Sequence, residues 1–278
     1  MKSLRHIFLI PIIFLSTNIY CIESDNAFQE QSMLAVLYLR TSAEYKANAT
    51  QTYASAKRHI DKALMEKSWT ALLNQKEEYE DLPPAIILDI DEAVLDNSDH
   101  QVRSIKNGTS YPTGWKEWVS EESAKPLPGV VDYLSYADSK KIKIFYVTNR
   151  TYDLEEYTKN NIKAIGLPFD DDIDVLLMKN EKGWSSDKTS RRNLIKKDYR
   201  VIQIIGDQLD DFIPTEETEV SINERKALID TYADMWGEKW FMLINPMYGQ
   251  WEEVLYEYCW ECYPKQSDKI KQRLKALE

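Results

Sequence analysis

Short apolar runs alternate with segments of helical periodicity along most of the chain. The apolar runs are typical of buried strands, and we expect strands at 85–89, 142–147, 175–178, 201–205 and 240–244. Helical spacing predicts helices at 27–80, at 129–139, from Thr151, from Ser185, at 221–236 and at 250–277. Strands that alternate with helices predict an α/β fold, in which a Rossmann-like parallel sheet carries helices on both faces.

Some local features sharpen this pattern. The Thr151 hydroxyl is expected to cap the helix that follows it, which carries Asp153 and Glu155 in its first turn. The segment 98–126 is polar and looks irregular, with glycines, prolines and two tryptophans. Cys259 and Cys262 form a C-x-x-C motif in what reads as the middle of a helix. We interpret them as a local disulfide or two free thiols, because a zinc site needs further ligands and histidines are scarce.

Two aspartates, Asp89 and Asp91, close the first predicted strand. Like charges placed so close together resist ionising together, and a divalent cation removes that conflict. The pair therefore indicates a metal-dependent enzyme and is typical of phosphoryl chemistry.

Polar residues also follow the later strands. Thr148 and Asn149 end the second strand, Lys188 lies at a helix start, and Asp207 and Asp211 follow the strand at 201–205. In parallel sheets the ligand binds beyond the carboxyl ends of the strands, so these residues are expected to meet there. Each alone has a plainer interpretation, as a helix cap, a solvent-facing charge or a turn. Their order along the chain is what favours a common site.

The chemistry of these residues suits phosphate-ester hydrolysis. Asp89 is placed to attack phosphorus and form an aspartyl-phosphate, with Asp91 as general acid and then base. Asp207 is expected to complete a Mg²⁺ site with Asp89, because Mg²⁺ prefers hard oxygen ligands. Lys188 and Thr148 are expected to hold the remaining phosphate oxygens.

The N-terminal segment resembles an export signal. A short basic stretch precedes an apolar core at 7–15, which is too short to span a membrane as a helix. We predict a signal peptide at 1–21 and one domain at 22–278, periplasmic or secreted. No later segment has transmembrane length. Lipidation at Cys21 is the less favoured alternative, because Asn18, Ile19 and Tyr20 make a poor lipoprotein site.

The bulk charge limits the partners of the protein. The 278 residues carry a formal net charge of −11, without a basic stripe. This balance argues against binding to a nucleic-acid polymer and favours a small-molecule substrate drawn in by a local cation. The sequence leaves open whether the protein forms a homo-oligomer.

The order D-x-D, hydroxyl, lysine and G-D-x-x-x-D resembles the haloacid dehalogenase superfamily of phosphohydrolases. Longer motifs resemble the class C bacterial acid phosphatases, which include surface lipoprotein acid phosphatases that act as nucleotidases. These motifs are Asp89-Ile90-Asp91-Glu92, Leu95-Asp96-Asn97, Trp115-Lys116-Glu117-Trp118-Val119, Pro128-Gly129, Phe145-Tyr146-Val147-Thr148-Asn149-Arg150, Gly206-Asp207-Gln208-Leu209-Asp210-Asp211-Phe212 and Asn245-Pro246-Met247-Tyr248-Gly249-Gln250-Trp251-Glu252. The resemblance implies a haloacid dehalogenase-like core with N-terminal helices and a small helical cap at about 98–126.

The same resemblance assigns residue roles. It implies Asp89 as nucleophile, Asp91 as acid/base and as a Mg²⁺ ligand through its backbone carbonyl, and Asp211 as a supporting acid. Asp207 would be the side-chain ligand of the metal. Lys188 falls in a stretch similar to that of the family's catalytic lysine. The implied substrates are small phosphomonoesters, above all nucleoside monophosphates, with Asn149 contacting the substrate and Trp115 and Tyr248 sandwiching the base.

The sequence departs from the family pattern at two positions. Ala93 replaces the usual threonine of D-x-D-E-T, and we expect a folded, active but modestly slower enzyme, since one lost neutral hydrogen bond costs roughly 1 kcal/mol. His100 stands where relatives often carry an aromatic residue, which bears on substrate preference. Two alternatives stay open: a broad acid phosphatase without nucleotide preference, and a non-catalytic binding or storage protein on the same scaffold.

Overall fold

The centre of the molecule is a five-stranded parallel sheet. The computed structural model describes residues 32–76 and 78–278. The strand order is β5-β4-β1-β6-β7, and all four neighbouring pairs are parallel. The strand bounds are Pro84–Leu88 for β1, Lys143–Thr151 for β4, Leu176–Lys179 for β5, Arg200–Gly206 for β6 and Trp240–Met242 for β7. The predicted α/β class and parallel sheet are confirmed.

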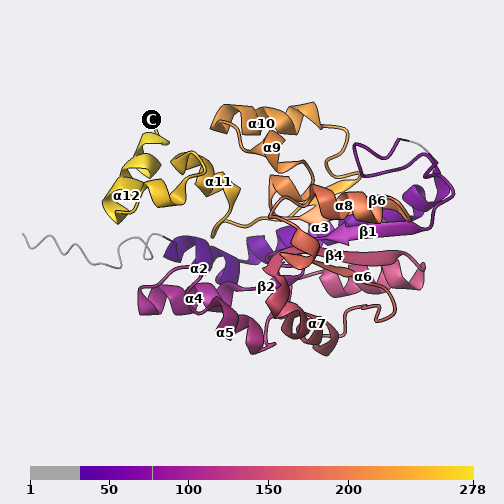
Figure 1. The fold of residues 1–278 in the computed structure, drawn as a ribbon, viewed down its shortest axis with the longest axis horizontal. Coiled ribbons are helices and arrows are strands. Elements are labelled where there is room, and N and C mark those ends of the chain that lie inside the picture. Colours follow the sequence, from indigo (N-terminus) through magenta and orange to yellow (C-terminus); the bar gives the residue numbers. More distant parts are fainter. Residues whose placement is uncertain (1–31, 77) are drawn as a thin grey trace, which may run out of the picture.

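Helices cover both faces of the sheet (Figure 1). One face packs against α3 (Ala43–Met65), α6 (Val130–Ser139) and α7 (Glu155–Ala164), through a core that includes Ile60, Leu134 and Ile162. The other face packs against α8 (Thr189–Ile195) and α10 (Ile222–Thr231). Because β1 lies in the middle and is apolar on both sides, the residues that follow it are carried to the centre of the carboxyl edge.

Local sequence signals explain several helix starts. Ser42 is extended and its Oγ accepts a hydrogen bond from the Tyr45 backbone N–H at 3.0 Å, which caps α3. Ser221 and Glu224 form a reciprocal capping box at the start of α10. The preceding helix α2 (Met33–Thr41) packs on α4 (Ser98–Asn107), so the N-terminal helices meet the segment predicted as the cap.

The segment 98–126 is more regular than its polar composition indicates. It holds α4 and α5 (Trp115–Ser120), and β3 (Lys125–Pro126) closes it by pairing antiparallel with β2 (Leu95–Asp96). The remaining short elements are α9 (Thr215–Thr218), α11 (Gln250–Glu253) and α12 (Gln266–Lys275), with 3-10 turns η1 (Tyr152–Leu154), η2 (Glu181–Gly183), η3 (Leu209–Asp211), η4 (Val254–Tyr256) and η5 (Trp260–Cys262).

Several predicted elements are corrected. The described part of the predicted helix at 27–80 contains two helices, α2 and α3, and is not helical after Met65. The helix at 221–236 ends at Thr231, and the strand at 240–244 ends at Met242. The tail at 250–277 is broken, because Glu257 and Tyr258 have left-handed backbone angles that no helix continues through.

Two local predictions have clear outcomes. Thr151 does not cap a helix, because its hydroxyl donates to the Asp153 carboxylate at 2.7 Å instead of accepting a backbone N–H. Cys259 and Cys262 form a disulfide, at the 3-10 turn η5 and not in mid-helix. The predicted signal peptide at 1–21, with Cys21, lies outside the described residues. Within them, no helix has the length and apolar character needed to cross a bilayer.

Candidate active site

Polar residues from four strand ends line one cavity at the carboxyl edge of the sheet. The cavity has a volume of about 590 Å³, and its lining includes Asp89, Asp91, Asn149, Lys188, Asp207, Asp211, Trp115 and Tyr248. Thr148 is the one predicted site residue outside this lining. It is fully buried, and its Oγ1 accepts a hydrogen bond from the Arg150 backbone N–H at 3.0 Å.

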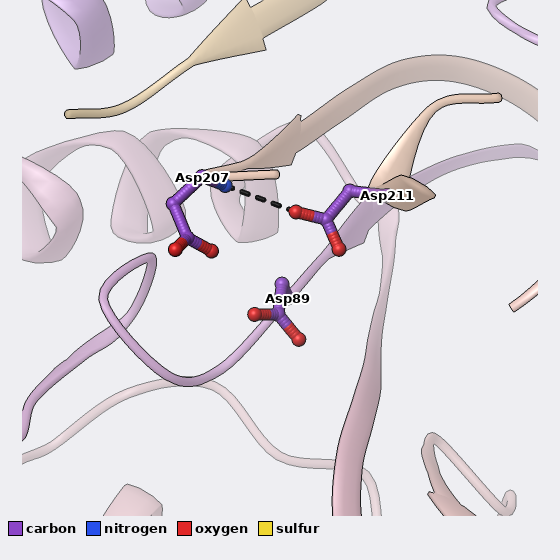
Figure 2. A group of neighbouring side chains, drawn as sticks. All are labelled: Asp89, Asp207 and Asp211. Carbon is purple, nitrogen blue, oxygen red and sulfur yellow. Dashed lines mark hydrogen bonds between the residues drawn. The ribbon is translucent and has the colours of Figure 1, made fainter. Parts of the chain in front are cut away.

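Three buried carboxylates form the centre of the site. Figure 2 shows Asp89, Asp207 and Asp211 gathered around a common space, and one oxygen of each lies within 4.8 Å of the others. Asp89 follows β1, Asp207 follows β6, and Asp211 ends the 3-10 turn η3. Gly206 makes the approach possible, because a Cβ at that position would lie 2.1 Å from Asp211 Oδ2.

The hydrogen bonds of the three carboxylates differ. Asp211 Oδ2 accepts the backbone N–H groups of Asp207 at 3.0 Å and Gln208 at 2.9 Å, and its Oδ1 pairs with Lys188 Nζ at 2.5 Å. Asp207 Oδ2 accepts the Gln208 and Asn245 side-chain amides at 2.8 and 2.9 Å. Both oxygens of Asp211 are therefore engaged, whereas no described residue donates a hydrogen bond to Asp207 Oδ1.

Lys188 is the cation of this centre. Its ammonium group is buried between Asp89 and Asp211 and pairs with both. Burial alone would lower the pKa of Lys188, but the carboxylates of Asp211 and Asp89 outweigh it and raise that pKa. The amine therefore stays charged and is placed to hold an anionic group above Asp89.

The charge balance of the centre fits a divalent cation. Three carboxylates and one ammonium leave a formal charge of −2. Burial, followed by the neighbouring carboxylates, raises the pKa of Asp207, and burial likewise raises the pKa of Asp89 despite the opposing Lys188. Hard oxygen donors with this surplus charge are the ligand set that Mg²⁺ and similar ions take in proteins. Asp89 and Asp207 are the residues that would hold it.

Asp91 faces the cavity from the loop after β1. Its side chain is 19% exposed, and one oxygen, Oδ1, is held by Asn97 and Arg150. Asn97 is itself fixed, because its Oδ1 accepts the Trp118 indole N–H at 2.8 Å. The carboxylate of Asp91 therefore has a defined orientation next to Asp89.

Aromatic side chains form another wall of the cavity. Trp115 begins α5 and makes edge contacts with His100 and Tyr111, at ring-centroid distances of 5.2 and 6.0 Å. Tyr248 comes from the loop after β7, and its hydroxyl donates to buried Glu92. Burial raises the pKa of Glu92 to about 8, and the Asp91 charge adds to the effect. Trp115 and Tyr248, 133 positions apart in sequence, thus line one space.

Comparison with known proteins identifies the family. A family model described as HAD superfamily, subfamily IIIB (acid phosphatase), matches residues 18–251. This chain belongs to that family. The fold is similar to the structure of the class C acid phosphatase from Bacillus anthracis, with a TM-score of 0.79 and 32% identity over 90% of this chain and 98% of that one. The structure of the same bacterial enzyme with tungstate bound gives the same score and identity over 91% and 98%.

Plant proteins show a more partial similarity to this acid phosphatase family member. The Stem 28 kDa and Stem 31 kDa glycoproteins of Glycine max are each 31% identical to it over 107 residues, which is 36% of this chain. The matches span 41% and 36% of those plant proteins.

The comparisons confirm the main sequence-based predictions. The resemblance to class C acid phosphatases of the haloacid dehalogenase superfamily is correct, and the predicted core fold is that of the family. Acid phosphatases are hydrolases of small phosphate esters, so the predicted enzyme class is confirmed at the level of the family. Phosphatases of this superfamily generally use a divalent metal, which agrees with the buried aspartate cluster.

Two arginines of the candidate site were not predicted as functional. Arg191 donates to the Thr148 carbonyl at 2.5 Å and to Asn149 Oδ1 at 2.8 Å, and it also reaches the carbonyls of Ser185 and Ser186. Arg192 donates to the carbonyls of Asp210 and Asp211 at 2.8 and 2.7 Å. Together they tie strand β4 and the turn after β6 to the helix start that carries Lys188. Their adjacency to the predicted lysine is the signal that could have identified them.

Proposed function

We propose that this protein is an exported, Mg²⁺-dependent phosphomonoesterase that hydrolyses small phosphate esters, above all nucleoside monophosphates. The observation that carries the proposal is one cavity that joins a buried Asp89–Lys188–Asp207 centre to a wall containing Trp115 and Tyr248. The tungstate bound to the B. anthracis relative supports oxyanion binding in this family, since tungstate is a tetrahedral oxyanion like phosphate.

The first chemical step uses Asp89 and Asp91. A carboxylate oxygen of Asp89 forms a bond to phosphorus while the bond from phosphorus to the leaving oxygen breaks. Asp91 gives its proton to that oxygen, so the alcohol leaves neutral. In the second step Asp91 takes a proton from water as the water attacks phosphorus, and the aspartyl-phosphate breaks to release inorganic phosphate.

Residues around the nucleophile are proposed to bind the phosphate. Lys188 carries the positive charge that stabilises the transferring group, and the Asn149 amide, which lines the cavity, is proposed to contact its oxygens. Thr148 is buried outside the lining, so its proposed role is to support Asn149 from behind. Mg²⁺, held by Asp89, Asp207 and the backbone carbonyl of Asp91, would reduce the repulsion between the nucleophile and the phosphate. Asp211 supports the site by fixing Lys188 and the Asp207 backbone.

The wall residues Trp115 and Tyr248 give the proposed preference for nucleotides. Both are aromatic and line the space next to the phosphate site, where a nucleobase can stack. The alternative is a broad phosphatase that does not recognise the base. His100 lines the same cavity in place of the aromatic residue of many relatives, so it affects this substrate preference. A binding or storage role is disfavoured, because Asp89, Asp91 and Lys188 all remain.

The decisive experiment is a substrate screen of the purified mature protein, residues 22–278, with and without chelator at mildly acid pH. We expect phosphate release from nucleoside monophosphates and from an aryl phosphate, loss of both with chelator, and recovery with Mg²⁺. An inactive protein under all conditions would refute the proposal. Mass analysis of the mature N-terminus tests cleavage after Cys21 against lipidation.

Nucleotide preference is tested separately with Tyr248→Ala and Trp115→Ala. We expect both variants to lose nucleotide turnover selectively, with aryl phosphate hydrolysis retained. Tyr152→Ala is the matched control, because Tyr152 is 49% exposed and lies outside the cavity lining. Equal losses on the two substrates would favour the broad phosphatase.

A further inference from the structure

The two oxygens of the Asp91 carboxylate are in different environments. Oδ1 lies 2.9 Å from Arg150 Nε, 2.8 Å from Arg150 Nη2 and 2.8 Å from Asn97 Nδ2. Among the described residues, none donates a hydrogen bond to Oδ2. Two residues therefore fix one oxygen, and the other is left for the substrate side of the cavity.

Arg150 is itself held in place on several sides. It lies in β4, is 2% exposed, and donates from Nη1 to Thr158 Oγ1 and from Nη2 to Asn97 Oδ1, each at 3.2 Å. Its guanidinium carbon lies 5.4 Å from the centre of the Trp115 ring. A planar guanidinium with this many fixed contacts loses little conformational freedom when it binds a carboxylate.

The other buried cations near the cavity have different partners. Lys188 pairs with Asp89 and Asp211, and Arg191 and Arg192 donate to backbone carbonyls and side chains of the neighbouring loops. Within the described residues, Arg150 is the cation that forms an ion pair with Asp91. A role in orienting Asp91 therefore falls on Arg150 and not on the phosphate-binding lysine.

We propose that Arg150 is a positioning residue for proton transfer, which anchors Oδ1 of Asp91 so that Oδ2 carries the proton to the leaving oxygen. The inference rests on the proposed function, in which Asp91 is the acid/base. The proton leaves Oδ2 as the bond from phosphorus to the leaving oxygen breaks, and a proton from water returns to Oδ2 in the second step. Without the guanidinium only Asn97 holds Oδ1, so the carboxyl group gains freedom to rotate and presents its proton to the leaving oxygen less often.

The experiment compares two esters in Arg150→Met and Arg150→Lys. p-Nitrophenyl phosphate has a leaving group that departs without a proton, whereas glycerol phosphate needs one. General acid catalysis contributes on the order of 10² to 10⁴ in rate, so we expect Arg150→Met to lose about 100-fold or more in kcat/KM on glycerol phosphate and less than about 10-fold on the aryl ester. Arg150→Lys keeps the positive charge but not the planar set of donors of the guanidinium. We expect it to retain more kcat/KM on glycerol phosphate than Arg150→Met does.

Control variants separate this role from a general structural one. Asp91→Asn removes the proton donor, so it should lose more kcat/KM on glycerol phosphate than on the aryl ester. Arg150→Met should show the same difference between the two esters. Arg103→Met is the matched control: Arg103 also lies over a tryptophan, Trp118, and pairs with a carboxylate, Glu121, but it is outside the cavity. We expect this control to leave the ratio of the kcat/KM values for the two esters unchanged.

The outcomes are distinguishable. If Arg150→Met lowers kcat/KM equally on both esters, the inference is overturned. A lower stability of this variant in urea does not change that conclusion. If Arg150→Met does not fold, Arg150→Lys is compared with the wild type instead: a loss of kcat/KM that is larger on glycerol phosphate than on the aryl ester supports the inference, and equal losses overturn it. If the wild-type protein is inactive, or if Asp91→Asn lowers kcat/KM equally on both esters, the inference also falls. In that case it falls because the proposed function itself is wrong.

Discussion

The buried carboxylate centre predicts that removing the nucleophile stabilises the metal-free protein. Asp89 shares its site with Asp207, Asp211 and a single ammonium, so the cluster has a formal charge of −2. Asp89→Asn lowers the negative charge by one and keeps an amide oxygen that can still accept from Lys188. The variant should therefore lose turnover and gain stability, which is the trade-off expected where an active site stores repulsion.

The magnitude follows from the pKa of Asp89. Burial raises that pKa from 3.8 to about 7 in the folded protein. An acid with a raised folded pKa destabilises the fold when it ionises, so stability is lost as pH rises from 3.8 towards 7 and is lowest above 7. By linkage the penalty in the wild type is about 1 to 2 kcal/mol at pH 5 and about 4 kcal/mol at pH 8. Asn carries no such penalty.

The assay is urea unfolding in the presence of chelator at pH 5 and pH 8. We expect the difference in the free energy of unfolding between Asp89→Asn and wild type to grow by about 2 to 3 kcal/mol from pH 5 to pH 8, in favour of the variant. Asp138→Asn is the matched control, an exposed aspartate on α6, and should show no such growth. An Asp89→Asn protein that is less stable than wild type at pH 8 would refute the account of the charge cluster. Added Mg²⁺ should make the wild type the more stable of the two proteins, because the ion stabilises the protein that binds it and Asp89→Asn lacks one of the proposed ligands.

Three further predictions test other parts of the site. Arg191→Met should lower the free energy of unfolding by about 3 kcal/mol in urea, because it leaves four oxygen acceptors without their charged donor; an exposed control, Arg58→Met, should change it by less than about 0.5 kcal/mol. Ala93→Thr should raise kcat by a modest factor and lower the melting temperature, because Ala93 is fully buried and an added side chain costs about 1 to 3 kcal/mol; an unchanged or lower kcat would contradict the first part. Asp211→Asn should raise KM for phosphate esters more than Asp210→Asn, because Asp211 is the one that pairs with Lys188, and steady-state kinetics on an aryl phosphate would show the order.

The sequence predicted the sheet and the site because both depend on short-range signals. Each buried strand contains an apolar run, and in β1, β4 and β6 polar residues of the site stand at or directly after the end of that run. Lys188 and Asp89 are 99 positions apart, yet they pair because parallel strands bring their carboxyl ends to one edge. The tail at 250–277 was mispredicted because long-range contacts overcame helical spacing. The Tyr258 hydroxyl donates to the Val220 carbonyl at 2.7 Å, which draws the chain out of the helical path.

Buried arginines could not be recognised from the same kind of pattern, since arginine is usually a surface residue. Arg150 and Arg191 are both 2% exposed or less, and each is stabilised by acceptors from distant segments. Their functions differ because their partners differ: Arg191 holds backbone carbonyls, so its loss should act on stability, whereas Arg150 holds a carboxylate that faces the cavity, so its loss should act on proton transfer. The identity of the acceptor, which only the structure provides, thus separates a residue that supports the fold of the site from one that positions its chemistry.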